Sequence, residues 1–194
     1  MMEGVTALSK SHPRPRALED ELRDHMVRYQ AGNAEGAEEL IQGLSPGLFG
    51  YFMNQHVPHS DAEDLLQECW MRIHRSRHTY HASQPLLPWV FAIARHTWLD
   101  GDRRRNRLAA REVLVASPPE HAGYVTAEVS QGPDVLRLLD QLPPSQREVV
   151  LLLKVSGMSV EEVAHVTSSS VGAIKQKAHR AYARLRGLLA KEDE

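Results

Sequence analysis

Apolar residues recur every three to four positions over most of this chain, and no segment shows a convincing alternation of period two. The first spacing places apolar side chains on one side of an α-helix, whereas the second would indicate a half-buried strand. In the N-terminal part the pattern predicts helices over residues 17–32 and 34–43, with continuation past Pro46, and further helices that begin at Asp61 and near Pro88. Proline suits a first helical turn because the N–H groups there have no intrahelical partner. The pattern therefore predicts an all-α fold.

The C-terminal part carries the pattern of a helix-turn-helix. Ser145 is placed to cap its first helix, and Gly157 is placed to end it. Ser159 and Glu162 have the capping-box spacing, in which each side chain accepts a hydrogen bond from the backbone N–H of the other residue. Four hydroxyl residues, 167–170, then form a short turn and offer a cap for a third helix. These signals predict two short helices followed by a longer one.

The third helix, which begins near Val171, is cationic on its polar side. No Asp or Glu occurs from Val171 to Leu189, whereas solvated helices usually mix both signs of charge. A cationic face suits DNA phosphates, although a solvated basic helix that closes a small bundle is the alternative. A helix-turn-helix inserts the N-terminal part of its second helix into the major groove. The side chains expected to read bases there are Lys175, Gln176, His179 and Arg180.

Charge and composition divide the chain into modules. The 194 residues carry a formal net charge of −2, which by itself does not suggest a nucleic-acid binder. Acidic residues nevertheless gather in residues 17–68, and basic ones in 95–111 and 175–186. Proline and glycine interrupt the stretch between Val113 and Asp134, which is typical of a linker. The predicted organisation is two helical domains, residues 17–111 and 135–190, joined by a flexible linker, 112–134, and preceded by a flexible tail, 1–16.

Several classes of protein are disfavoured. The single cysteine, Cys69, excludes an intramolecular disulfide and agrees with a reducing cytosol. The apolar run 86–94 is far too short to span a bilayer, and no signal peptide is visible, so we expect a cytoplasmic protein without membrane insertion. His74 and His78 lie one helical turn apart, but no CxxC or HExxH motif accompanies them, so surface histidines are favoured over a zinc site. No phosphate-binding loop or nucleophile motif is found, so neither an enzyme nor a cofactor is expected.

A polar stripe marks the helix that begins at Asp61. Its members are Asp61, Asp64, Gln67, Glu68 and Arg72. Acidic residues at the start of a helix and basic residues near its end complement the helix dipole, which is sufficient reason for such a stripe. The same side chains would also suit the docking of a charged partner helix. The residues alone leave both interpretations open.

Aromatic and basic residues gather in the second half of the first domain. Trp89 and Trp98 lie close in sequence to Arg95 and to the arginine run that follows. Aromatic rings with arginines suit the unstacked bases and backbone of single-stranded DNA. Both tryptophans also fall on an apolar stripe, which favours a place in the core. Tyr80 is expected to be more exposed, in a polar loop, residues 79–87, that has room to enclose an extruded base.

Three blocks of the chain resemble the extracytoplasmic-function (ECF, group IV) sigma factors of bacterial RNA polymerase. They read DAEDLLQECWMRIHR at residues 61–75, LLPWVFAIARHTWLDGDRRRNR at 86–107, and LPPSQREVVLLLKVSGMSVEEVAHVTSSSVGAIKQKAHRAYARLR at 142–186. The resemblance covers both predicted domains and leaves out the tail and most of the linker. It implies a sigma region 2 bundle followed by a sigma region 4 helix-turn-helix.

The resemblance also implies roles for individual residues. The polar stripe would grip the clamp helices of the polymerase β′ subunit. The loop after it and the next helix would hold the melted minus-ten strand through Arg77, Tyr80, His81, Ser83, Gln84, Trp89, Arg95, Arg103, Arg104 and Arg105. The last helix would read the minus-thirty-five element through Ser170, Lys175, Gln176, Lys177, His179, Arg180 and Arg184. Of these, Lys177 and Arg184 would contact phosphates.

The implied protein is a dissociable initiation subunit that performs no bond chemistry. Its implied partners are core RNA polymerase, through the β′ and β subunits, promoter DNA, and an anti-sigma factor that is soluble or membrane-bound. One alternative is a response regulator with a LuxR-like output domain, which needs a βαβ receiver that the pattern does not show. Another is a helical adaptor or anti-sigma-like protein whose basic helix binds no DNA.

Overall fold

The computed structural model describes residues 16–112 and 138–192, and these form helices, turns and short loops without any strand. The first range contains α1 (Arg16–Gln30), α2 (Ala34–Met53), α3 (His59–Ser76), the 3-10 turn η2 (Arg77–Thr79) and α4 (Leu86–Glu112). The second contains α6 (Pro144–Val150), the π-helical turn η3 (Leu151–Val155), α7 (Val160–Val166) and α8 (Val171–Glu192). The predicted all-α class is confirmed. The predicted tail and linker lie almost entirely outside the described residues.

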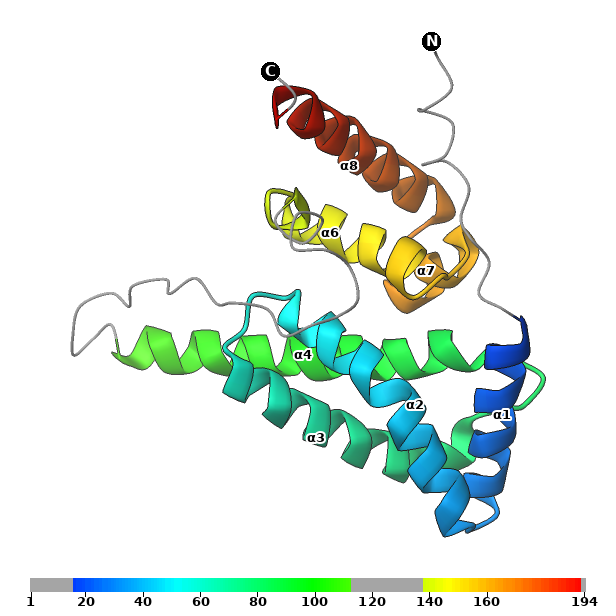
Figure 1. Ribbon diagram of the computed structural model, residues 1–194. Helices are drawn as coiled ribbons and strands as arrows, with labels where there is room; N and C mark the ends of the chain where they lie inside the picture. Colours follow the sequence, from blue (N-terminus) through cyan, green and yellow to red (C-terminus); the bar gives the residue numbers. More distant parts are fainter. Residues whose placement is uncertain (1–15, 113–137, 193–194) are drawn as a thin grey trace.

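In the first range, α2 packs against α1, α3 and α4 (Figure 1). Asn33 caps α2, because its side-chain oxygen accepts a 2.6 Å hydrogen bond from the Gly36 N–H. Pro46 lies inside α2, as the predicted continuation past it requires. The Gln42 carbonyl that the proline leaves unpaired belongs to an exposed residue. The largest fully buried side chains of this bundle are Met26, Leu40, Leu48, Phe52, Ile73, Leu86 and Val90.

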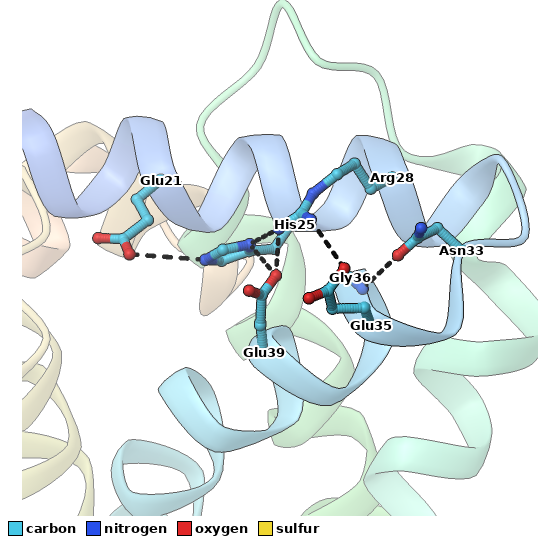
Figure 2. A network of polar contacts seen from close by, with 7 residues as sticks. All are labelled: Glu21, His25, Arg28, Asn33, Glu35, Gly36 and Glu39. Atoms are coloured by element: carbon cyan, nitrogen blue, oxygen red, sulfur yellow. Dashed lines mark hydrogen bonds and ion pairs between the residues drawn. The ribbon is translucent and has the colours of Figure 1, made fainter.

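A polar network that the sequence did not reveal joins α1 to α2 beside the Asn33 cap (Figure 2). His25 Nδ1 lies 2.9 Å from the Glu39 carboxylate, and its Nε2 lies 3.7 Å from Glu21. Arg28 forms an ion pair with the same carboxylate of Glu39. These contacts fix α1 across the start of α2, where the absence of a side chain at Gly36 lets the two backbones approach closely.

Three predicted helix starts differ from the structure. The helix expected to open at Asp61 begins two residues earlier, at His59, and α4 begins at Leu86, inside the predicted loop. The expectation that Ser145 caps a helix is wrong. The helix begins before it, at Pro144, and no side chain caps this end. Proline at the first helical position already has the required φ and lacks an N–H that needs a partner, so a hydroxyl cap is dispensable there.

The helix-turn-helix signals of the second range are confirmed. Ser159 Oγ accepts a 3.1 Å hydrogen bond from the Glu162 N–H, and the Glu162 carboxylate accepts one of 2.7 Å from the Ser159 N–H. Gly157 has a φ of +60°, in the left-handed region expected after a helix end. Ser170 Oγ accepts a 3.2 Å hydrogen bond from the Ala173 N–H, so the polar turn supplies the hydroxyl cap of α8.

The second range packs directly against the first. Figure 1 shows α6 and α7 lying between α4 and α8, and α7 contacts both of these helices. One cluster of buried apolar side chains runs across both ranges, from Phe52 and Phe91 to Leu152, Met158 and Val163. A smaller cluster lies between α6 and α8 and includes Val150 and Ala181. The sequence indicated two domains and a linker, but it did not indicate that the two domains share a core.

We expect Gly36→Ala to lower the free energy of unfolding. The added Cβ would lie 2.7 Å from Arg28 Cβ and 3.1 Å from the His25 carbonyl oxygen, and neither atom moves without a shift of α1. Overpacking of this kind costs about 1–3 kcal/mol, which thermal unfolding followed by circular dichroism should show as a lower Tm.

Gly47→Ala is the matched control in the same helix, because a Cβ there meets nothing within 4 Å. The better helix propensity of alanine should stabilise this variant by about 0.5–1 kcal/mol. A Tm that rises equally in both variants would contradict the close approach of α1 and α2.

Candidate partner and nucleic-acid interfaces

The predicted polar stripe lies along an open groove between α3 and α4, with a volume of about 590 Å³. Each member of the stripe lines this groove: Asp61, Asp64, Gln67, Glu68 and Arg72. The facing wall, on α4, contains Asp100, Arg104, Arg105 and Arg107. Met71, 49% exposed, adds an apolar side chain to the α3 wall. The groove therefore presents both signs of charge around an apolar group, as a docking surface for a charged helix would.

Arg72 fixes the middle of the groove. Its Nε donates a 2.9 Å hydrogen bond to Glu68, and its Nη1 donates one of 2.8 Å to Asp100 on α4. The hydrogen bond from Arg72 holds the pKa of Asp100 below its usual value, and the two carboxylates raise the pKa of Arg72. The Arg72 and Asp100 charges therefore persist at neutral pH. Asp64 and Gln67 are exposed and have no polar partner within the described ranges, which leaves them free to bind another molecule.

Tyr80 is buried under the loop that follows η2 and holds it in place. The expectation that Tyr80 is exposed is wrong: the residue is 3% exposed, its ring centroid lies 5.5 Å from that of Trp89, and its hydroxyl donates a 2.9 Å hydrogen bond to the Gln84 carbonyl. Burial accordingly raises the pKa of Tyr80. Trp89 and Trp98 pack against the core, as their place on an apolar stripe indicated. The polar side chains that the loop exposes are His81, Ser83 and Gln84.

The basic residues of α4 have two environments. Arg103 and Arg104 are exposed near its C-terminal end. Arg105 is half-buried, and its guanidinium lies 3.7 and 3.6 Å from carboxylates of α3 and α4. Arg95, near the middle of the helix, has a side chain that is 19% exposed and donates a 3.0 Å hydrogen bond to Glu148 of α6. Arg103 also lies 3.6 Å from Asp100 in a solvent-exposed ion pair. The exposed pair is open to a nucleic-acid backbone, whereas Arg95 is engaged inside the protein.

The cationic helix α8 presents its predicted reading residues to solvent. Ile174, Ala178 and Ala181 are buried on its inner side. The predicted DNA contacts that are exposed are Ser170, Lys175, Gln176, His179, Arg180 and Arg184, and Lys177 is half-buried at the edge of the same face. Figure 1 shows α8 on the outside of the molecule, beyond α6 and α7. A duplex can therefore approach this face without any rearrangement of the helix-turn-helix.

The cysteine and the histidines that the structure describes do not come together as metal ligands. His74 Nδ1 lies 2.6 Å from the hydroxyl of Tyr29, and Arg77 lies over the Tyr29 ring at 5.7 Å. Cys69 is fully buried in the core. Within the described ranges no group of three His, Cys, Asp or Glu side chains has the geometry of a metal site. In those ranges there is also no helix with the length and apolarity needed to cross a bilayer.

The fold and these surfaces define, over the described residues, an all-helical protein with a charged groove and a helix-turn-helix. Residues 44–108 match the family model for Sigma-70 region 2, and residues 134–185 match that for Sigma-70, region 4. CarQ, an RNA polymerase sigma factor of Myxococcus xanthus, is 33% identical over 84% of this chain and 95% of its own length. The ECF RNA polymerase sigma factor SigF of Caulobacter vibrioides is 32% identical over 84% and 90%.

A solved structure agrees with these relatives. The sigma factor RpoE of Bartonella quintana, crystallised with the anti-sigma factor NepR, matches with a TM-score of 0.66 and 25% identity, over 81% of this chain and 98% of that one. The chain belongs to the family of ECF RNA polymerase sigma factors. Members of this family bind core polymerase and direct it to promoters, and they are not enzymes.

The thiol of Cys69 should be inert in the folded protein. Burial raises its pKa to about 12, so at about pH 8 only about one thiol in ten thousand is the reactive thiolate. We expect Ellman's reagent to leave the native chain unmodified and to titrate one thiol per chain in guanidinium chloride.

Gln42→Cys provides the control, because it places a thiol on the exposed side of α2. This variant should react rapidly with one equivalent of reagent under native conditions. Equally rapid reaction of Cys69 in the native protein would show that the core around it opens to solvent.

Proposed function

We propose that residues 17–111 bind core RNA polymerase and the minus-ten element, and that residues 135–190 read the minus-thirty-five element. The observation that carries this proposal is the order of the two family matches along one chain, region 2 at 44–108 and region 4 at 134–185. A groove with free polar side chains lies in the first match, and an outward-facing cationic helix lies in the second. Each proposed domain thus has a surface that suits its proposed partner.

In this proposal the α3–α4 groove receives the clamp helices of the β′ subunit. Asp64 and Gln67 make the first contacts, because they need not exchange an internal partner. Asp61, Glu68 and Arg72 hold the groove in shape through their ion pairs with α4 and with one another. Met71 gives the partner helix an apolar contact at the centre of a polar rim, the arrangement typical of a specific interface.

The loop after η2 and the end of α4 are proposed to hold the melted minus-ten strand. His81, Ser83 and Gln84 would bind an extruded base, while Tyr80 and Trp89 support the loop from below. Arg103 and Arg104 would contact phosphates of the same strand. Arg77, Arg95 and Arg105 would join them only after exchanging their present intramolecular partners for DNA.

The N-terminal half of α8 is proposed to enter the major groove of the minus-thirty-five element. Lys175, Gln176, His179 and Arg180 lie on the exposed face at this end of the helix. Ser170 lies at the helix start, where free backbone N–H groups attract a phosphate. Lys177 and Arg184 would contact the backbone on either side. Positively charged side chains there neutralise phosphates, so this binding should weaken as salt rises.

The chain is proposed to act without catalysis and in the cytoplasm, where the polymerase lies. Binding and positioning explain the surfaces described above, and none of them requires bond chemistry. The Bartonella quintana RpoE structure contains an anti-sigma factor, and we extend that kind of partner to this chain. Such a partner, soluble or membrane-bound, would cover the polymerase-binding groove and hold the free chain inactive.

The response-regulator alternative finds no support in the described residues. A receiver domain needs a parallel sheet, and no strand occurs in residues 16–112 or 138–192. The adaptor alternative predicts no polymerase binding.

Reconstitution with bacterial core polymerase separates the candidates: the sigma proposal requires promoter-specific transcripts that core polymerase alone does not produce. Duplex binding by the chain without any holoenzyme would overturn it.

We expect Asp64→Ala to weaken binding to core polymerase roughly tenfold, about 1.4 kcal/mol, because the substitution removes an exposed carboxylate that would contact the polymerase. The anisotropy of a fluorescent chain titrated with core polymerase measures this loss. Glu63→Ala is the matched control, since Glu63 is an exposed acid on the same helix that does not line the groove. Equal losses in both variants would show that net charge, and not the groove, determines the affinity.

We expect Lys175→Ala with Arg180→Ala to reduce discrimination between minus-thirty-five sequences, at a cost of about 1–3 kcal/mol per lost base contact. Arg184→Ala should instead weaken binding to all sequences alike and flatten the salt dependence by about 0.9. Transcription from promoter variants by the reconstituted enzyme measures both effects. Unchanged promoter choice in the double variant would place the reading residues elsewhere on α8.

A further inference from the structure

A buried carboxylate joins the second domain to the first. Glu148, in α6, is 7% exposed, and its Oε1 accepts two hydrogen bonds from the first domain. The hydroxyl of Tyr51, in α2, donates one at 2.9 Å, and Arg95 Nε, in α4, donates the other at 3.0 Å. We call these three residues the Glu148 bridge. The bridge ties one helix of the helix-turn-helix domain to two helices of the bundle.

Most of the bridge is removed from water, although the Arg95 side chain remains 19% exposed. Tyr51 is 3% exposed, and its ring meets Phe91 edge to face at 5.6 Å. Burial and the adjacent Glu148 charge raise the pKa of Tyr51 well above its usual value, so the phenol keeps the proton that it donates. Phe91 belongs to the apolar cluster that both domains share. The polar contacts of Glu148 therefore lie inside the interface between the domains and not at its rim.

Arg147, the residue before Glu148, provides a second polar contact across the interface. It is 4% exposed, and its Nη1 donates a 3.2 Å hydrogen bond to the Asn54 carbonyl at the end of α2. Its other donors bind three carbonyls of its own domain, those of Leu139, Asp140 and Leu142. Arg147 and Glu148, two consecutive residues of α6, thus fix the position of α6 against α2 and α4.

Arg95 belongs to the proposed minus-ten surface, yet its guanidinium is already engaged. Glu148 places a carboxylate oxygen where a phosphate oxygen would have to lie to accept the same N–H. Arg103 and Arg104, further along α4, remain exposed. A single-stranded backbone can therefore contact the end of α4 in this arrangement, but a phosphate can accept the Nε–H of Arg95 only when Glu148 moves away.

We propose that the free chain holds itself closed through the Glu148 bridge, so that its own second domain masks Arg95 from the minus-ten strand. This inference rests on the proposed function, because it takes Arg95 as a phosphate contact. The closed arrangement needs no second protein, since every donor and acceptor of the bridge belongs to this chain. Opening exchanges the carboxylate of Glu148 for a DNA phosphate on Arg95 and frees the second domain to move.

The test uses the full chain without polymerase. Glu148→Ala should shift the population to the open form, seen as a larger radius of gyration in small-angle X-ray scattering. Binding to fluorescein-labelled, mixed-sequence single-stranded DNA should tighten about tenfold, because a larger fraction of the chain is then competent to bind. The slope of log K against log salt should become steeper by about 0.7, as expected for one additional phosphate neutralised by Arg95.

Three further variants separate opening of the chain from a general loss of structure. Tyr51→Phe removes one hydrogen bond and keeps the Arg95 pair, so it should open the chain partially while leaving the helical circular dichroism unchanged. Arg95→Ala in the Glu148→Ala background should remove the steeper salt slope but keep the larger radius of gyration. Glu161→Ala, which removes an exposed acid from α7 of the same domain, should change neither quantity.

The inference is overturned if Glu148→Ala and Tyr51→Phe both keep the radius of gyration and the single-strand affinity of the unmodified chain. It is also overturned if Glu148→Ala opens the chain but Arg95→Ala leaves its salt slope unchanged, because Arg95 would then not be the masked contact. The proposed function is tested in a separate experiment, which measures promoter-specific transcription by the unmodified chain with core polymerase. Its failure would remove the proposed function, whereas closure by the bridge would still be visible in the scattering.

Discussion

The carboxylate of Glu148, buried where the two domains meet, is the contact on which their arrangement depends. A carboxylate that leaves water loses several kcal/mol of hydration, which only close hydrogen bonds from well-placed partners offset. Tyr51 and Arg95 supply those bonds to a single oxygen. A half-formed bridge would leave a buried charge uncompensated. The domains are therefore stable either fully docked or fully apart, with each group returned to water.

The shared apolar cluster and the bridge contribute different properties to this interface. Burial of Phe91, Leu152 and Met158 favours association, but apolar contact is not directional and would tolerate several registers. The bridge and the Arg147 hydrogen bonds form only when α6 lies in one position against α2 and α4. In that position α8 faces outward with its proposed base-reading residues exposed, while most of the Arg95 side chain is covered. Closure would thus withhold part of the proposed minus-ten surface and leave the proposed minus-thirty-five surface accessible.

Features encoded by neighbours in sequence could be predicted well. The Ser159 and Glu162 capping box, the hydroxyl cap at Ser170 and the exposure of the α8 face depend on residues at most a few positions apart, and the structure shows all of them. Ser145 was misassigned because two preceding prolines start the helix without a cap. Tyr80 was misplaced because its polar neighbours hid an aromatic contact with Trp89, nine residues away.

Contacts between distant parts of the chain could not be predicted in this way. From the sequence, Glu148 is expected to be an ordinary exposed acid near the start of a helix, and none of its sequence neighbours indicates that it is buried. Its partners lie 97 and 53 residues earlier, so only the tertiary fold brings them together. The α3–α4 groove was half predicted: the α3 side follows from helical periodicity, whereas the Arg72 to Asp100 pair that closes it depends on how α4 packs.

The most direct test of self-closure is a distance between the domains. Spin labels on Gln42→Cys and Ala183→Cys would report it, because both positions are exposed and Cys69 is too deeply buried to take a label. If the Glu148 bridge closes the free chain, pulsed electron paramagnetic resonance should give one narrow distance for the chain alone and a different, longer distance in the complex with core polymerase and promoter DNA. A broad distribution in the free chain, or the same narrow distance in both states, would contradict closure by the bridge.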